Sequence, residues 1–244
     1  MPLVESAVDT LESGLCAERA GAGRIELCAG LNDAGTTPSA GLIAAAAERC
    51  RIPVFVLIRP RGGGFVYSDD ELHVMMRDVE MASSLGAEGI VIGALDASAR
   101  IDLPKTRKLV SAAKDLPVTF HRAFDLVANL GEALDQLIEV GVARVLTSGG
   151  ANTALEGAPR IAALIKQAAG RIGIVAGGGV RENNVREIIT LTGVKEVHAR
   201  IASIVCGAAP ARSSLKLRKR LPDNEGAWEE LDESRMRDLV QQAG

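Results

Sequence analysis

The stretch PVTFHRAFD, residues 117–125, joins an apolar, strand-like run to three side chains that can do chemistry. His121, Arg122 and Asp125 supply an imidazole, a guanidinium and a carboxylate. An imidazole titrates near neutral pH and suits proton transfer, while a planar guanidinium suits a bound anion. We therefore expect the end of this strand to lie within a catalytic or binding site.

Other short apolar runs also end in polar side chains of these types. The candidates for proton transfer are Glu5, Glu26, His121, Asp125 and His198. The candidates for binding an anion are Arg59, Arg61, Arg122, Ser148, Gly177, Gly178 and Gly179. The three glycines precede a predicted helix, so their backbone N–H groups could hold a phosphate; the alternative is that they only permit a tight turn.

These side chains must be positioned by a regular alternation of strands and helices. Eight strands are predicted, at Leu3–Val8, Arg24–Ala29, Val54–Arg59, Gly89–Ala94, Val118–Ala123, Arg144–Ser148, Gly173–Gly177 and Glu196–Ile201. Helical patterns lie between them, and several end at a glycine shortly before the next strand. Eight such units in 244 residues predict a single (β/α)8 TIM barrel over residues 1–244. A doubly wound open sheet is the alternative, although no Gly-rich dinucleotide loop follows the first strand.

Residues 202–231 interrupt this pattern before the last helix. The segment is polar and contains Gly and Pro, so we expect it to be irregular, as a disordered insertion or as a mobile lid over the barrel mouth. It includes the basic run KLRKR at 216–220, which is more typical of a solvated loop than of a binding tail.

Alternation of side chains along each strand indicates which residues face the barrel interior. In RIELC, Ile25 and Leu27 share the side that must face the helices, so Glu26 and Cys28 point inward. Glu5 has the corresponding position on the first strand. Two buried carboxylates repel unless cations lie nearby, and Arg59, Arg61 and Arg122 are the expected cations.

The same alternation separates the two basic residues of HRAFD. We place His121 at the barrel mouth beside Glu26. Arg122 falls on the opposite side of the strand, where it could face outward and fix the following loop through Asp125.

The composition of the chain limits the kinds of partner that it can bind. The chain is 47% hydrophobic and 24% charged with a net charge of −3, which argues against nucleic acid or an anionic membrane as the partner. We find no signal peptide and no apolar run long enough to span a membrane.

The four cysteines form no CxxC pair, which favours reduced thiols in the cytoplasm. Cys28 is the candidate metal ligand, and His121 and His198 could converge with it on the barrel axis, although a lone cysteine is more often part of a core.

Several strings together resemble the copper homeostasis protein CutC family. They include RIELCAGL, IRPRGG, TFHRAFD, RVLTSGG, AGGGVRENN and GVKEVHAR, in order along most of the chain. The resemblance implies a TIM barrel, a cytoplasmic homo-oligomer and a role in copper handling, with copper(I) bound by cysteine thiols. Of the two cysteines in copper-binding members, Cys28 matches the second, whereas Ala7 occupies the position of the first.

Two functions therefore remain open. The first is a copper homeostasis factor that binds copper(I). The second is an enzyme on a small anionic or phosphorylated metabolite, with isomerase, epimerase or lyase chemistry, in which His121 is the general acid or base and Arg59 and Arg122 clamp the anion. A scaffold that works through its oligomer interface is a third possibility.

Overall fold

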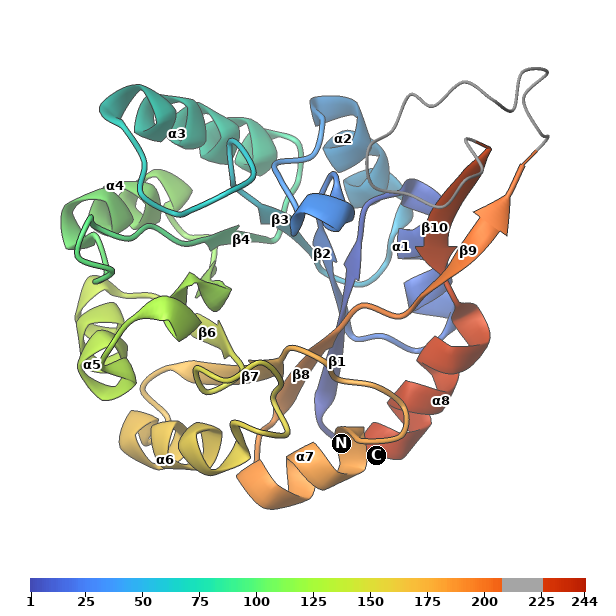
Figure 1. Cartoon of the computed structure of the whole chain (residues 1–244). Coiled ribbons are helices and arrows are strands. Elements are labelled where there is room, and N and C mark those ends of the chain that lie inside the picture. The colour runs from blue at the N-terminus through green and yellow to red at the C-terminus, as the bar shows by residue number, and fades with distance from the viewer. Residues whose placement is uncertain (208–225) are drawn as a thin grey trace.

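The strands close into a barrel, as the sequence predicts. A computed structural model describes residues 1–207 and 226–244 (Figure 1). Eight parallel strands pair in sequence order, and β1 pairs with β8 to close the sheet. The strands are β1 (Leu3–Val8), β2 (Arg24–Leu27), β3 (Val54–Leu57), β4 (Gly89–Ile92), β5 (Val118–Phe120), β6 (Arg144–Thr147), β7 (Gly173–Gly177) and β8 (Glu196–Ala199). The (β/α)8 prediction is confirmed, and the open-sheet alternative is excluded by the β1–β8 pairing.

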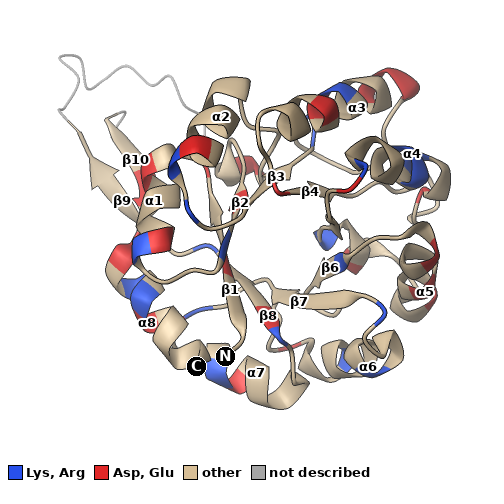
Figure 2. Cartoon of the chain, turned by 180° about the vertical axis from the view of Figure 1, so that it is seen from behind, with Lys and Arg blue, Asp and Glu red and all other residues tan. Residues whose placement is uncertain are grey.

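Helices surround the barrel and alternate with the strands (Figure 1). They are α1 (Leu11–Arg19), α2 (Ala40–Arg49), α3 (Asp69–Ser84), α4 (Leu103–Ala113), α5 (Leu130–Val140), α6 (Ala158–Ala168), α7 (Val185–Thr192) and α8 (Glu233–Ala243), with 3-10 turns η1 (Leu31–Asp33) and η2 (Arg122–Leu126). In residues 1–207 and 226–244, none of these helices is long and apolar enough to cross a membrane. Charges of both signs are mixed over the outer helices, and few lie on the strands (Figure 2).

Local sequence explains where the helices begin and end. Ser68 accepts a hydrogen bond from the backbone N–H of Glu71, and the Glu71 side chain accepts one from Ser68 N–H, which satisfies two free donors at the start of α3. Helix α5 ends at Gly141, whose φ of 86° is in the left-handed region that glycine adopts without strain. Strand β6 begins at Arg144, three residues later, as the sequence pattern predicts.

The hydrophobic core lies mainly between the barrel and its helices. Ile25 and Leu27 are fully buried there, as strand alternation predicts. Inside the barrel a separate, smaller apolar cluster contains Cys28, Phe55, Leu57 and Val91. The rest of the interior combines polar side chains such as Glu5, Arg24 and Glu26 with apolar ones such as Leu146. The helix-facing layer therefore supplies most of the apolar burial that stabilises the fold.

The segment expected to be irregular is regular at both ends. Strands β9 (Ala202–Cys206) and β10 (Ala227–Leu231) pair antiparallel and form a hairpin between β8 and α8. The register pairs Ala202 with Leu231 and Cys206 with Ala227. The polar sequence between the two strands led to the expectation of an irregular segment. The basic run at 216–220 lies outside the described residues.

Glycine at the start of β4 is required by the packing inside the barrel. A Cβ atom at Gly89 would lie about 2.5 Å from ring carbons of Phe55. We expect Gly89→Ala to lower the free energy of unfolding by about 1–3 kcal/mol through overpacking.

The matched control is Gly41→Ala on α2, where a Cβ atom would meet nothing within 4 Å. This change should raise the free energy of unfolding by about 0.5 kcal/mol, because alanine is the better helix former. Urea denaturation of both variants measures the two effects, and equal effects would contradict the packing argument.

Candidate functional site

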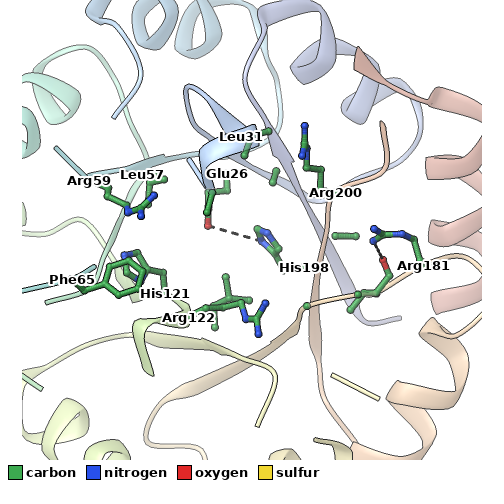
Figure 3. Close-up of a pocket in the computed structure, with 17 residues that line it drawn as sticks. Glu26, Leu31, Leu57, Arg59, Phe65, His121, Arg122, Arg181, His198 and Arg200 are labelled. Atoms are coloured by element: carbon green, nitrogen blue, oxygen red, sulfur yellow. Dashed lines mark hydrogen bonds and ion pairs between the residues drawn. The ribbon is translucent and has the colours of Figure 1, made fainter. Parts of the chain in front are cut away.

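A pocket opens at the carboxyl ends of the barrel strands. Its volume is about 350 Å³, within the range of small-molecule sites. Its polar lining comes from several strands and loops and includes Glu26, Arg59, His121, Arg122, His198 and Arg200. These side chains surround one central opening (Figure 3). This is the end of a TIM barrel at which βα loops meet and active sites form.

Two carboxylates and one imidazole form a buried cluster at the base of this pocket. Glu5 on β1 and His198 on β8 are register partners, and Glu5 Oε1 lies 2.7 Å from His198 Nδ1. Glu26 Oε2 on β2 lies 4.0 Å from the same nitrogen (Figure 3). The inward orientation predicted for both glutamates is thus observed. Their imidazole partner, however, is His198 and not His121.

A buried arginine compensates the charge of this cluster. Arg24 is 3% exposed, forms an ion pair with Glu5, and donates to Glu196 at 2.6 Å. The expectation that Arg59, Arg61 and Arg122 would be the compensating cations is wrong, because all three bond elsewhere. Strand alternation could have predicted this role of Arg24. Arg24 lies two residues before Glu26, so the two side chains are on the same side of β2.

The cluster shifts the pKa of each of its members. Burial alone would raise the pKa of Glu5, but His198 and Arg24 outweigh it and lower that pKa to about 2. Burial would lower the pKa of His198, but the carboxylates of Glu26 and Glu5 raise it. The pKa of Glu26 is raised by burial and by Glu5. Glu5 is therefore the fixed anion, and Glu26 is the carboxyl that most readily carries a proton.

His121 lies in a different environment on the pocket wall. Its Nδ1 accepts a hydrogen bond of 3.1 Å from Ala123 N–H, and its ring lies 4.9 Å from the ring of Phe65. Burial, together with the charge of Arg59, lowers the pKa of His121 to about 3. The ring is thus neutral at physiological pH and can donate or accept a hydrogen bond, but it is not a cation.

The two arginines after β3 hold loops together. Arg59 is buried and donates to the carbonyls of Asp33, at 3.0 Å, and Gly63, at 2.7 Å, while its side chain also lines the pocket. Arg61 points away from the pocket and pairs with Glu71 of α3. The sequence predicts that both arginines bind an anion. Arg59 lines the pocket, but Arg61 does not, so its position does not support that prediction.

The end of β5 continues directly into η2, which changes the direction of Arg122. Arg122 Nε donates to Asp125 Oδ2 at 2.8 Å, as the sequence predicts, and its Nη2 donates to Ser148 Oγ at 2.8 Å. Asp125 also accepts from the backbone N–H groups of Ser148 and Gly150. Asp125 and Ser148 thus anchor η2 to the end of β6 outside the pocket. Arg122 itself lines the pocket instead of facing outward, because strand alternation ends where the 3-10 turn begins.

The three glycines after β7 have different positions. Gly177 belongs to β7, and a Cβ atom there would lie 2.5 Å from Leu146 Cδ1, so this glycine permits close packing inside the barrel. Gly178 and Gly179 line the pocket with φ values of 101° and 69°. The backbone of these two residues, and not that of Gly177, forms the pocket wall.

Comparison with known proteins identifies the family to which the chain belongs. A sequence model of the CutC family matches residues 2–203. The chain belongs to the CutC family. It is 46% identical over 228 residues to the mouse copper homeostasis protein cutC homolog, covering 88% of this chain and 84% of that protein. It is 47% identical over 212 residues to the human homolog, covering 87% and 75%.

A solved structure agrees as well. The copper homeostasis protein CutC from Streptococcus agalactiae superposes with a TM-score of 0.78 at 38% identity, covering 81% of this chain and 98% of that one. The barrel is therefore the CutC family fold.

Copper(I) prefers two or more soft ligands, and this CutC family chain offers few in its barrel. Cys28 is fully buried, with Sγ 3.5 Å from Glu26 Oε1, and the first-strand position is Ala7. The remaining cysteines lie elsewhere: Cys16 on α1, Cys50 after α2, and Cys206 exposed on β9. Burial and Glu26 raise the pKa of Cys28 well above its usual value and keep the thiol protonated. The donors in the described residues do not fit a two-thiolate copper(I) site.

A cation that prefers oxygen and nitrogen ligands could be considered for the Glu5–Glu26–His198 cluster instead. Glu5, Glu26 and His198 each offer a ligand atom, and these atoms lie within 4.8 Å of one another. The oxygens of Glu5, however, already bond His198 and Arg24. A cation bound there would compete with both contacts and would be repelled by the charge of Arg24.

Two pocket arginines were absent from the predicted site. Arg200 lies two residues after His198 and therefore on the same side of the strand; it pairs with Glu229 of β10. Arg181 follows the glycine loop, and its Nη1 donates to the carbonyl of Val180 at 2.7 Å. Arg181 and Arg59 have no carboxylate partner among the described residues. They give the mouth of this CutC family barrel an excess of positive charge.

Glu5 links stability to pH. Its pKa rises from about 2 in the folded chain to about 4.5 in the unfolded chain, so its contribution of about 3 kcal/mol is complete above pH 4.5 and is lost as pH falls toward 2. We expect Glu5→Gln to be less stable than wild type by about 3 kcal/mol at pH 7, and this gap to narrow below pH 4.5.

Urea denaturation from pH 7 to pH 3 measures the gap. Glu80→Gln, an exposed glutamate of α3, serves as the control and should follow the wild-type curve. A gap that stays constant over this range would contradict the role of Glu5 as the buried, charged partner of His198 and Arg24.

Proposed function

We propose that the protein acts in copper homeostasis, and that its working part is the barrel-mouth pocket, where it performs acid–base chemistry on a small anionic compound. The copper half of this proposal is supported by the names of its mouse and human relatives. The chemical half is carried by one observation: the Glu5–His198–Glu26 cluster borders a pocket that is rich in guanidinium groups.

The cluster divides acid–base roles among its members. Glu5 stays ionised and holds His198 in a fixed orientation, in the manner of a carboxylate that orients a catalytic imidazole. Glu26 has a raised pKa and a free oxygen, so it can take up a proton and return it. Two carboxyl groups with pKa values shifted in opposite directions are the arrangement in which one supplies charge and the other transfers protons.

The surrounding guanidiniums indicate the charge of the compound. Arg181 and Arg59 are not balanced by carboxylates of the described chain, and Arg122 reaches the pocket beside Gly178. In a partly buried site these charges attract an anion more strongly than they would in water. The expected reactions are those that need only proton transfer, namely isomerisation, epimerisation or lyase cleavage.

Copper enters this proposal as the process that the protein serves; to hold copper(I) as a cargo, Cys28 would need a second soft ligand. The family resemblance also leads us to propose a cytoplasmic homo-oligomer whose partner is a small ion or molecule. We propose no nucleic-acid or membrane partner, in line with the net charge of −3.

Copper(I) binding can be tested directly. Because Cys28 lacks a second thiol in the barrel, anaerobic titration with a copper(I) chelator as competitor should show micromolar or weaker binding that Cys28→Ala leaves unchanged. Cys206→Ala, which removes the exposed thiol, reports any copper held at the surface. A tight stoichiometric complex that is lost in Cys28→Ala would instead establish copper(I) as the cargo of the barrel.

The anion can be found by a thermal-shift screen of phosphorylated and carboxylated compounds. A ligand of the native state raises the melting temperature, and at 100 times its Kd it stabilises by about 2.7 kcal/mol. We expect hits whose shift is lost or at least halved in Arg181→Gln and retained in Arg107→Gln, an exposed arginine of α4. If no compound binds, or if every hit is indifferent to Arg181→Gln, the pocket is not an anion site.

A further inference from the structure

Three residues that line the pocket each have a buried polar atom with no hydrogen-bond partner among the described residues: Arg59 at Nε, Glu26 at Oε2 and His121 at Nε2. Glu26 is 6% exposed and His121 is 7% exposed. An unsatisfied buried polar group costs about 1–3 kcal/mol, so native proteins keep few of them without a function. Glu26 and His121 line the same pocket, from different sides of its opening (Figure 3).

The hydrogen bonding of His121 decides which of its nitrogens carries the proton. Because Nδ1 accepts from Ala123 N–H, the proton of the neutral ring is on Nε2. The free nitrogen is therefore a donor, and it requires an acceptor from a ligand. The ring is held in this orientation by Phe65 and by close packing on Gly93, where any Cβ atom would overlap the imidazole.

Glu26 offers the complementary group. One oxygen accepts a weak hydrogen bond from Cys28 Sγ at 3.5 Å. The other, Oε2, lies 4.0 Å from His198 Nδ1 and has no hydrogen-bond partner among the described residues. The pocket thus presents a neutral N–H donor and a carboxyl oxygen to one ligand. A neutral imidazole that polarises a carbonyl oxygen, opposite a carboxylate that takes the adjacent proton, is an established arrangement for enolisation.

We propose that the pocket binds a small anionic hydroxy-carbonyl compound, with its carbonyl oxygen on His121 Nε2 and the neighbouring C–H group facing Glu26. This inference rests on the proposed acid–base function and names its substrate class. The anionic end of the compound lies toward the guanidiniums of Arg181 and Arg122 at the pocket mouth.

The proton transfer balances without a further reactant. Glu26 takes the proton from the carbon next to the carbonyl, and the electron pair of that C–H bond forms the C=C bond of an enediolate. Negative charge moves to the carbonyl oxygen, which accepts the hydrogen bond from His121 Nε2–H. Return of the proton from Glu26 to the same carbon regenerates the starting compound. Return to the former carbonyl carbon gives the isomer, because the proton of the neighbouring hydroxyl then moves to the oxygen held by His121 and that hydroxyl carbon becomes the new carbonyl. The low pKa of His121 keeps the ring neutral, and the Oε2 atom of Glu26, which has no hydrogen-bond partner among the described residues, is available to accept the proton.

Pairs of compounds that differ only in the carbonyl group test whether the pocket binds a carbonyl oxygen. We would measure the affinities of dihydroxyacetone phosphate against glycerol 3-phosphate, and of ribulose 5-phosphate against ribitol 5-phosphate, by calorimetry. At least one carbonyl compound should bind the full-length protein tenfold or more tightly than its alcohol. His121→Asn, whose Oδ1 can still accept from Ala123 N–H but which lacks the N–H toward the pocket, should abolish that preference while the alcohol binds as before.

Two further variants serve as controls for folding and site. His121→Phe fills the ring volume without a donor and should give the same loss of preference. His73→Asn, at an exposed histidine of α3, should leave all affinities unchanged. Equal binding of carbonyl and alcohol in the wild type, or a preference that survives in both His121 variants, would overturn the proposal.

Hydrogen exchange tests the chemical half. In D2O the wild type should exchange the C–H protons next to the carbonyl of the bound probe for deuterium. Proton NMR measures this exchange as the loss of the C–H signal. Glu26→Gln should slow this exchange at least 100-fold, the scale of general-base catalysis, with little change in probe affinity. Exchange that is absent in the wild type or unaffected by Glu26→Gln overturns the proposal. If anions from the thermal-shift screen still bind through Arg181, the proposed function stands and only the hydroxy-carbonyl assignment fails.

Discussion

The ion pair between Arg24 and Glu5 inside the barrel is the interaction on which the site depends. A carboxylate in a low-dielectric interior is costly unless a cation and hydrogen bonds compensate it. Arg24 is the register partner of Glu5 on the neighbouring strand and supplies that charge, and it also forms an ion pair with Glu196. With Glu5 fixed as an anion, His198 gains a permanent hydrogen-bond partner and Glu26 is the remaining acid of the cluster.

This constraint separates the residues that support the site from those that face a ligand. Arg59, Asp125 and Ser148 bond the loops to the strand ends, and they define the shape of the pocket more than its chemistry. Glu26 and His121 each keep a polar atom free on the pocket wall. The side-chain oxygens of Asp125 and Ser148 are hydrogen-bonded, whereas Glu26 Oε2 and His121 Nε2 have no hydrogen-bond partner among the described residues, so the supporting shell is fixed while the facing groups are available to a ligand.

Strand and helix periodicity was enough to predict the barrel, and alternation within strands was enough to turn Glu5, Glu26 and Cys28 inward. The pairing of His198 with the glutamates was beyond the sequence, because it depends on the β1–β8 register, which joins the two ends of the barrel. Arg122 departed from strand alternation where η2 begins, and a turn of five residues gives no periodic signal. Residues 202–206 and 227–231 pair with each other across a long polar separation, so their strands were not evident from composition.

The closure of the barrel has a consequence for how the site comes into being during folding. Glu5 and His198 are separated by 193 residues, and they meet only when the first strand pairs with the last. Contacts so distant in sequence form late, because the chain must first bear the entropy of closing the intervening loop. Until that moment the chain holds two neighbouring acids without their imidazole, so a partly folded barrel has no acid–base cluster. Native chemistry at this site therefore reports complete assembly of all eight strands.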